Sequence, residues 1–402
     1  MDLRVAYILA TSKGGIPHYT AELANAIAKY INDVTVIKPK TTTADNMFSE
    51  NVKVVNAFRP LNVSTTYAYR LRGIIRMLSI NNLIGFFLSY KNASVLEEVN
   101  PDIVHITDSS PQALMLLYKF FKKRPVVITI HDSSKPIFIL TKSLPLLIYS
   151  TFVSISNILA LILLRKADKV ITHTQRNKKE LSEEWRVKPE NIVTIPHGSY
   201  RYFQRKFKSN VNEEANCILF FGHIRALSKP LDPLVDAIPI IKKEIPNIKC
   251  IIAGSGVIPK RSYQIIEKNK PNFEVHNYFI PNEKVGEFFS RASLVVITNK
   301  HQKGHSGVLT IAYSFGKPVV TTNVGEFPTL VRDTSCGLIV PPDNPKALAE
   351  AIIKLLKDEN LRKKMSKNAL KMAGKLSWDN IAKMHIKVYE EVLDERKKRN
   401  KD

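Results

Sequence analysis

Residues 3–28 read LRVAYILATSKGGIPHYTAELANAIA: a short apolar run, a loop with two adjacent glycines and a longer amphipathic segment. The apolar run predicts a buried strand over residues 3–10, and the segment after the glycines predicts a helix over about 17–30. A second β-branched run follows at 34–37. Continuous apolar strands that alternate with helices are typical of a parallel sheet covered on both faces.

The same alternation continues along the chain and breaks once, in the polar and basic stretch at 200–215. We therefore predict an α/β fold with two domains of similar size joined near residue 205, which suits a length of 402 residues. Helices are expected at about 344–356, 358–373 and 377–396. Further strands are predicted at 103–106, 126–130, 169–172 and 192–195 before the break, and at 217–221, 248–253, 294–298, 319–322 and 338–340 after it.

The composition is that of a globular protein, with 44% hydrophobic and 24% charged residues, but 60 Lys and Arg against 36 Asp and Glu give a net charge of +24. So large an excess implies an anionic partner: nucleic acid, nucleotide phosphates or an acidic membrane surface. Nucleic acid is not expected, because no binding module is visible and the charge is spread over both halves. Cys217, Cys250 and Cys336 are far apart, which argues against a disulfide scaffold or a zinc site.

The stretch Ser143 to Leu164 (SLPLLIYSTFVSISNILALILL) contains no charged residue and is long enough to span a bilayer. Three interpretations stay open: a buried helix, a helix in the membrane interface and a transmembrane span. Residues 51–166 hold 14 basic and 5 acidic side chains, which favours adsorption to anionic lipid. The first residues lack the pattern of a signal peptide, so we expect a cytoplasmic protein that is peripheral at the cell membrane.

Three segments could bind an anion. Gly14 and Gly15 separate the first strand from its helix, where backbone amides can approach a phosphate, although a tight turn without a ligand is the alternative. Arg225 and Lys229 follow the strand 217–221, where two cations can neutralise a diphosphate unless they are simply solvated surface. The loop GHSGV at 304–308 opens a helix and again offers free amides.

These segments resemble one large family, the GT-B-fold glycosyltransferases of family 4. The resemblance rests on GGIPHYTAELANAIA, ADKVITHT, IPHGSY, FFGHIRALSKPLDPLVDAI, IIAGSGV, SGVLTIAYSFGKPVVTTNVGEFPTLV, CGLIVPPDNPKALAEAI and SWDNIAKMHIKVYEEVL, in this order and over almost the whole chain. It implies two Rossmann-like β/α/β domains that face each other across a deep cleft. The expected domains are 1–205 on the acceptor side, 206–376 for the nucleotide sugar, and a helix at 377–402 that crosses back to the first domain.

The resemblance also implies site residues. His131 ends the strand 126–130 where the family has a histidine near the transferred sugar, although a histidine that caps a loop is the alternative. Arg225 and Lys229 match the diphosphate-binding pair, with one residue more between them than is usual and with His223 where many members have Arg. These three residues are the expected catalytic groups. The expected donor-binding residues are Gly14, Gly15, Gly222, Ser306, Gly307, Val308 and Thr310.

The chain departs from the family at its paired glutamates, whose positions are Lys303 and Ile311 here. An isoleucine cannot accept the hydrogen bonds of a ribose, so Thr310 and Tyr313 are the nearby polar candidates. The implied reaction is a retaining transfer from a UDP- or GDP-sugar to a lipid-linked or glycan acceptor, in surface polysaccharide or glycolipid synthesis. No cofactor and no metal are expected. The alternatives are a non-catalytic relative, which the missing glutamates favour, and a nucleotide-sugar epimerase.

Overall fold

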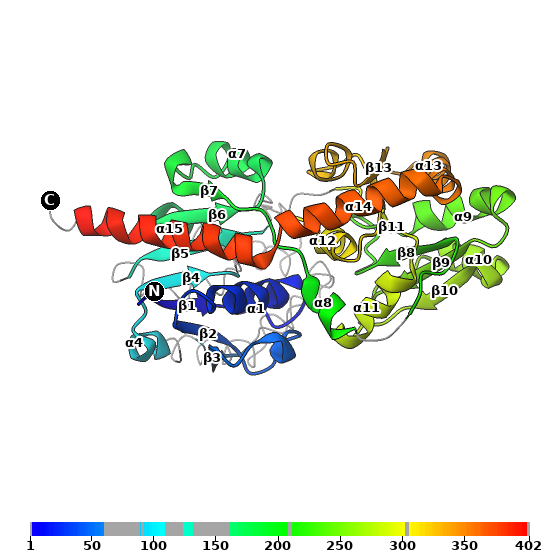
Figure 1. The fold of residues 1–402 in the computed structure, drawn as a ribbon. Helices are drawn as coiled ribbons and strands as arrows, with labels where there is room; N and C mark the ends of the chain where they lie inside the picture. The colour runs from blue at the N-terminus through cyan, green and yellow to red at the C-terminus, as the bar shows by residue number, and fades with distance from the viewer. Residues whose placement is uncertain are drawn as a thin grey trace, which may run out of the picture. The chain divides into compact units, whose positions relative to one another are not determined.

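The computed structural model describes residues 2–59, 89, 92, 94–108, 124–131, 161–207, 211–301 and 305–399. They form two compact units, Met1–Pro196 with Trp378–Asp402 and His197–Ser377, each with its own sheet (Figure 1). Of the apolar stretch Ser143 to Leu164, residues 143–160 lie outside the described residues, while Leu163 and Leu164 are buried in the core of the first unit. In the described part of the chain, no helix has the length and apolarity that crossing a bilayer requires.

The first unit is built on a parallel sheet whose described strands run in the order β3-β2-β1-β4-β5-β6-β7. Its central strands are almost wholly buried, as β4 and β5 demonstrate, because helices cover both faces of a parallel sheet. The strands are β1 (Arg4–Ile8), β2 (Asp33–Pro39), β3 (Val52–Phe58), β4 (Ile103–Ile106), β5 (Val126–Ile130), β6 (Lys169–Thr172) and β7 (Ile192–Thr194), and the helices are α1 (Gly15–Ile27), α4 (Val95–Val99), α7 (Gln175–Glu183) and α15 (Trp378–Arg399).

The second unit repeats this plan with described strands in the order β10-β9-β8-β11-β12-β13, all parallel. Its core lies between the sheet and the flanking helices, with Leu234, Ile252 and Ile352 fully buried. The strands are β8 (Cys217–Phe221), β9 (Lys249–Ala253), β10 (Phe273–His276), β11 (Leu294–Ile297), β12 (Val319–Thr322) and β13 (Gly337–Val340), and the helices are α8 (Arg201–Lys206), α9 (Asp232–Glu244), α10 (Lys260–Lys268), α11 (Asn282–Arg291), α12 (Gly307–Ser314), α13 (Pro345–Lys357) and α14 (Glu359–Lys375).

Helix α15 belongs to the first unit although it ends the chain, and it lies along α1 (Figure 1). Trp378 at its start packs edge-on against Tyr19 of α1, with 5.3 Å between ring centroids. At its other end Arg396 donates two hydrogen bonds of 2.9 and 2.8 Å to the buried carboxylate of Asp168. Apolar and ionic contacts therefore anchor both ends of this helix.

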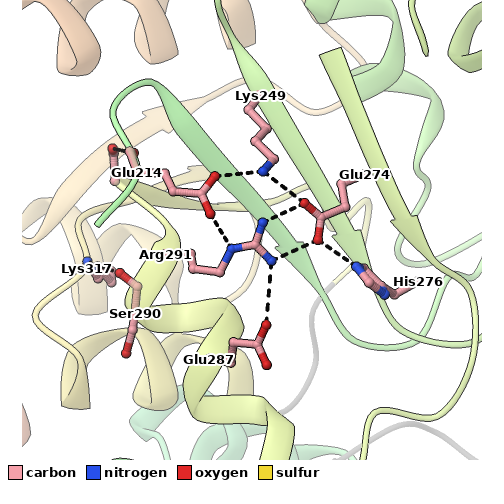
Figure 2. A network of polar contacts seen from close by, with 9 residues as sticks. Glu214, Lys249, Glu274, His276, Glu287, Ser290, Arg291 and Lys317 are labelled. Atoms are coloured by element: carbon pink, nitrogen blue, oxygen red, sulfur yellow. Dashed lines mark hydrogen bonds and ion pairs between the residues drawn. The ribbon is translucent and has the colours of Figure 1, made fainter. Parts of the chain in front are cut away.

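An ion-pair network joins the elements near the amino ends of β8, β9 and β10 (Figure 2). Arg291, at the end of α11, donates to both oxygens of Glu274 at 2.8 and 2.6 Å and to Glu214. Lys249 lies 2.7 Å from Glu214 and 3.0 Å from Glu274. Hydrogen bonds from Arg291 hold the pKa of Glu274 well below its ordinary value. The network, which we call the Arg291 network, fixes three strands and one helix to one another.

The two parallel α/β sheets expected from the sequence are confirmed, but three elements were not predicted. The polar and basic stretch 200–215, read as a break between the domains, contains helix α8. The strands β3 and β10 were not predicted; both are edge strands, so solvent reaches them and polar residues such as Lys53 and Glu274 interrupt their apolar pattern.

Candidate functional site

The glycine loop of the first unit joins β1 to α1. Gly14 has φ +89°, a left-handed conformation that favours glycine, and its carbonyl accepts a hydrogen bond of 2.9 Å from Nδ1 of His18. A Cβ placed on Gly14 or Gly15 would meet no described atom within 4 Å. No described atom therefore fills the space beside these two glycines at the start of α1, where the dipole and amides of a helix favour an anion.

Asp108 fixes the segment that leads into this loop. It lies two residues beyond β4, it is fully buried, and its Oδ2 accepts hydrogen bonds from the amides of Ala10 and Thr11 at 3.1 and 2.5 Å. Asp108 was not among the site residues expected from the sequence. A polar residue just after a buried strand was the available signal, because ligands of parallel sheets bind at the carboxyl ends of their strands.

His131 follows β5 at the same edge of the sheet. Its Nε2 lies 2.9 Å from the carbonyl oxygen of Thr107, and its Nδ1 lies 2.9 Å from Nε2 of His173, the residue that follows β6. The edge of the Tyr19 ring packs against it, with 4.6 Å between centroids. Burial lowers the pKa of His131, and the Thr107 carbonyl and the charge of Asp108 oppose this shift.

Both ring nitrogens of His131 are therefore engaged inside the first unit. The imidazole could bond a substrate only by exchanging one of these two partners. His173 was not among the expected site residues, although it follows β6 directly, as His131 follows β5.

In the second unit, the loop after β8 carries Arg225 and Lys229. The amide of Arg225 donates to the carbonyl of Lys229 at 3.1 Å, and the amide of Lys229 donates back at 2.8 Å, which closes a tight turn. Ile224 forms a parallel bridge with Gly256 of the loop after β9. A Cβ on Gly254 would lie 1.9 Å from the carbonyl oxygen of Gly222, so these two loops pack backbone against backbone and hold the turn in place.

The cations of this turn have no carboxylate partner in the described part of the chain. Burial and the nearby charge of Arg225 lower the pKa of Lys229, and burial together with both cations lowers the pKa of His223. Among the described residues, no carboxylate forms an ion pair with Arg225 or Lys229. Basic groups that repel one another without a counter-ion are the arrangement expected of an anion-binding site.

Helix α12 begins beside this loop, since Val308 Cγ2 lies 3.5 Å from the position of a Cβ on Gly222. The Ser306 carbonyl accepts hydrogen bonds from the amides of Leu309 and Thr310. The amides of Gly307 and Val308 lie in the first turn of the helix, where no intrahelical acceptor is available to them. The Ser306 hydroxyl is buried and has no hydrogen-bond partner in the described chain. Such a group costs free energy unless a ligand satisfies it.

The two polar candidates for a ribose are used inside the protein. The Thr310 hydroxyl is buried and donates to the Gly307 carbonyl at 3.0 Å, and the buried Tyr313 hydroxyl donates to the Leu330 carbonyl. Ile311 is only 7% exposed. Lys303, the other position of the missing glutamates, lies outside the described residues.

The expected site residues therefore form two groups. The carboxyl edge of the second sheet carries Gly222, Arg225, Lys229, Ser306, Gly307 and Val308. The carboxyl edge of the first sheet carries Gly14, Gly15 and His131. No cluster of His, Cys, Asp or Glu that could hold a metal ion occurs among the described residues.

Two family profiles cover most of the chain. The profile for Glycosyltransferase Family 4 matches residues 13–199, and the profile for Glycosyl transferases group 1 matches residues 203–372.

Known proteins are similar over much of their length. An uncharacterized glycosyltransferase of Methanocaldococcus jannaschii is 27% identical over 319 residues, 78% of this chain and 82% of that protein. A phosphatidyl-myo-inositol mannosyltransferase of Mycobacterium tuberculosis is 23% identical over 304 residues, 72% of this chain and 74% of that one. Other alignments span about half the length of the curated relatives. Anabaena HepE, solved with UDP and glucose, shares the fold at a TM-score of 0.70 and 17% identity, over 97% of this chain and 100% of that one.

Proposed function

The chain belongs to the glycosyltransferases of family 4, and from this premise we propose that it transfers a sugar, with retention of anomeric configuration, from a UDP- or GDP-sugar to a lipid-linked or glycan acceptor. The expected fold class, two Rossmann-like units of the GT-B type, is confirmed by the two parallel sheets and by the solved structures that share it. The identity of donor, acceptor and linkage forms the rest of the proposal.

The donor assignment rests on the pair Arg225 and Lys229. This pair has no described carboxylate partner, and its loop lies beside the start of α12. A nucleoside diphosphate supplies the missing negative charge, and the free amides and the Ser306 hydroxyl can bond its phosphate oxygens. Crystals of Anabaena HepE contain UDP, which supports a diphosphate in this family. Either uridine or guanosine fits the proposal.

The same groups can lower the barrier to transfer. When the bond between the anomeric carbon and the diphosphate oxygen breaks, negative charge grows on the departing nucleoside diphosphate. Fixed cations and amides next to this charge stabilise the transition state more than the ground state, an effect typically worth several kcal/mol. Arg225 and Lys229 are therefore the residues on which we expect transfer to depend most.

An acceptor at the cytoplasmic face of the membrane is supported by the net charge of +24. A nucleoside diphosphate needs only a few of these cations, so the remainder suits a larger anionic surface. The mannosyltransferase relative is named for a phosphatidyl-myo-inositol acceptor. We therefore propose peripheral binding to anionic lipid and a role in surface polysaccharide or glycolipid synthesis.

A thermal-shift experiment tests the donor assignment. We expect UDP or GDP to raise the melting temperature of the wild-type protein, and we expect Arg225→Ala to abolish this rise. Arg332→Ala is the matched control, since Arg332 is an exposed arginine of the same unit that pairs with Asp333. Stabilisation of the Arg225→Ala variant equal to that of the wild type would sink the assignment.

Turnover and the membrane need separate measurements. With the sugar donor that stabilises best, the anomeric configuration of the product, read by NMR, decides between retention and inversion. Cosedimentation with vesicles of phosphatidylcholine, with and without phosphatidylglycerol, tests whether the protein binds anionic lipid. Stabilisation without transfer to any acceptor would favour the non-catalytic relative.

A further inference from the structure

Four groups form one line of hydrogen bonds in the first unit. The Thr107 carbonyl lies 2.9 Å from Nε2 of His131, Nδ1 of His131 lies 2.9 Å from Nε2 of His173, and Nδ1 of His173 lies 3.0 Å from the Ile195 carbonyl. All three distances are those of good hydrogen bonds. His173 is buried, with 5% of its surface exposed, and His131 is partly buried.

The number of protons in this line follows from its ends. A carbonyl oxygen can only accept, so Nε2 of His131 and Nδ1 of His173 must both carry a proton. A third proton is needed between the two rings, because two lone pairs would otherwise face each other at 2.9 Å. Two neutral imidazoles carry only two protons. The geometry thus requires one proton more than the neutral pair can supply.

The surroundings can hold that extra charge. The Asp108 carboxylate favours the charged form of His131, whereas burial opposes it. Burial disfavours the charged forms of the neighbouring His385, His105 and Tyr19. Burial lowers the pKa of His385 to about 4 and that of His105 well below its ordinary range, and it raises the pKa of Tyr19. Asp108 is the described group whose charge favours the protonated form of His131.

We propose that His131 and His173 share three ring protons at neutral pH, so that the pair carries one positive charge, and that His173 is a positioning residue that fixes the ring of His131. The extra proton is taken from solvent and resides between the two facing nitrogens. The proton count is independent of the proposed function, whereas any effect of the pair on transfer rests on it. The chemistry is that of a coupled pair, in which the protons belong to both rings together.

Nitrogen-15 NMR of the full chain, labelled only at histidine, counts these protons directly. Long-range correlations distinguish a protonated ring nitrogen from one with a lone pair. His131→Asn and His173→Gln identify the signals of the pair, and His276, which bonds Glu274 in the other unit, is the reference that should not shift. At pH 7 we expect three protonated nitrogens and one lone pair in the two rings. Two protonated nitrogens would overturn the proposal.

Two substitutions of His173 separate charge from position. A glutamine can still donate to Nδ1 of His131 but cannot hold the extra proton, so in His173→Gln we expect His131 to become neutral while its ring stays in place. In His173→Val we expect His131 to lose both the extra proton and the fixed position of its ring. If His131 remains doubly protonated in His173→Gln, the shared proton is refuted.

Transfer assays then measure what the charge does. We expect the wild-type kcat/KM to fall as rising pH removes the third proton, and we expect His173→Gln to lose this limb of the pH profile. An unchanged profile in His173→Gln contradicts a role of the pair in transfer. Absence of transfer in the wild type would count against the proposed function. The NMR measurement would still test the number of protons on the two rings.

Discussion

The two ends of the second sheet differ in how their basic residues are paired. At the amino ends of its strands, Arg291 and Lys249 are matched by Glu214 and Glu274 in one closed network (Figure 2). At the carboxyl end of β8, Arg225 and Lys229 face each other without a carboxylate among the described residues. The same two residue types thus stabilise the fold at one end, and at the other end they are the proposed ligand-binding cations.

This difference separates structural cations from functional ones in a chain with 60 of them. A paired cation is expected to contribute to stability and little to binding. An unpaired, mutually repelling pair destabilises the free protein and is retained where an anion binds. Substitutions at the carboxyl end should therefore change activity and nucleotide binding, whereas substitutions at the amino end should change the free energy of unfolding.

Arg225→Ala should have the largest effect and no structural cost. Loss of one preformed contact to a developing negative charge typically lowers kcat by about 100- to 1,000-fold. Because no described carboxylate pairs with Arg225, the melting temperature should stay the same or rise. Steady-state kinetics and thermal unfolding of the same preparation measure both. A large fall in melting temperature would break the comparison.

Arg291→Ala should show the reverse. It leaves Glu214 with Lys249, and Glu274 with Lys249 and His276. Hydrogen bonds to charged groups contribute about 1.5–3 kcal/mol each. We expect the free energy of unfolding, measured in urea, to fall by about 2–4 kcal/mol, with kcat/KM close to wild type below the melting temperature. Arg332→Ala, at an exposed pair, is the control and should change little. Lost activity in a folded Arg291→Ala protein would contradict this assignment.

Ser306→Ala probes the buried hydroxyl at the start of α12. Since this hydroxyl has no described partner, its removal should leave stability unchanged or slightly raised. If a donor phosphate satisfies it, nucleotide affinity should fall by about 5- to 10-fold, the size of one hydrogen bond of about 1 kcal/mol. Isothermal titration calorimetry with UDP and GDP measures the change. Equal affinity with lower stability would assign Ser306 to helix capping.

The smallest effect concerns the pH dependence of Lys229. Its folded pKa is lowered by burial and by Arg225, so the ammonium loses its proton at a pH below the ordinary 10.5 and the site then loses one cation. Nucleotide affinity should therefore weaken as pH rises through this lowered pKa, by a few-fold. Lys229→Arg keeps its charge, so its affinity should be flat over the same range. A parallel decline in both proteins would assign the effect to another group.

Much of the fold was predictable because buried strands are unbroken apolar runs. The strands β4, β5, β6, β8 and β12 match the expected ranges from end to end. The edge strands β3 and β10 mix polar with apolar residues, so they lack the unbroken apolar run by which the buried strands were predicted. The six-residue helix α8 is too short to show a helical period.

The candidate site was less predictable, because partners are set by tertiary contacts. Sequence pattern could place His131 and Arg225 at strand ends, and both lie there. It could not reveal that both ring nitrogens of His131 are occupied, or that the Thr310 and Tyr313 hydroxyls donate inside their own unit. Those facts depend on contacts with residues 17 or more positions away or on the turn of a helix.

The helix α15 makes the first unit a discontinuous one. Its Tyr389 hydroxyl lies 2.6 Å from Nδ1 of His105 in β4, and its Trp378 ring packs against Tyr19. A fragment that stops before residue 378 would therefore lack part of its own core, and no single cut separates the two units intact. An independently folding first unit has to be made by joining residue 196 to residue 378, or by supplying the last helix as a separate peptide.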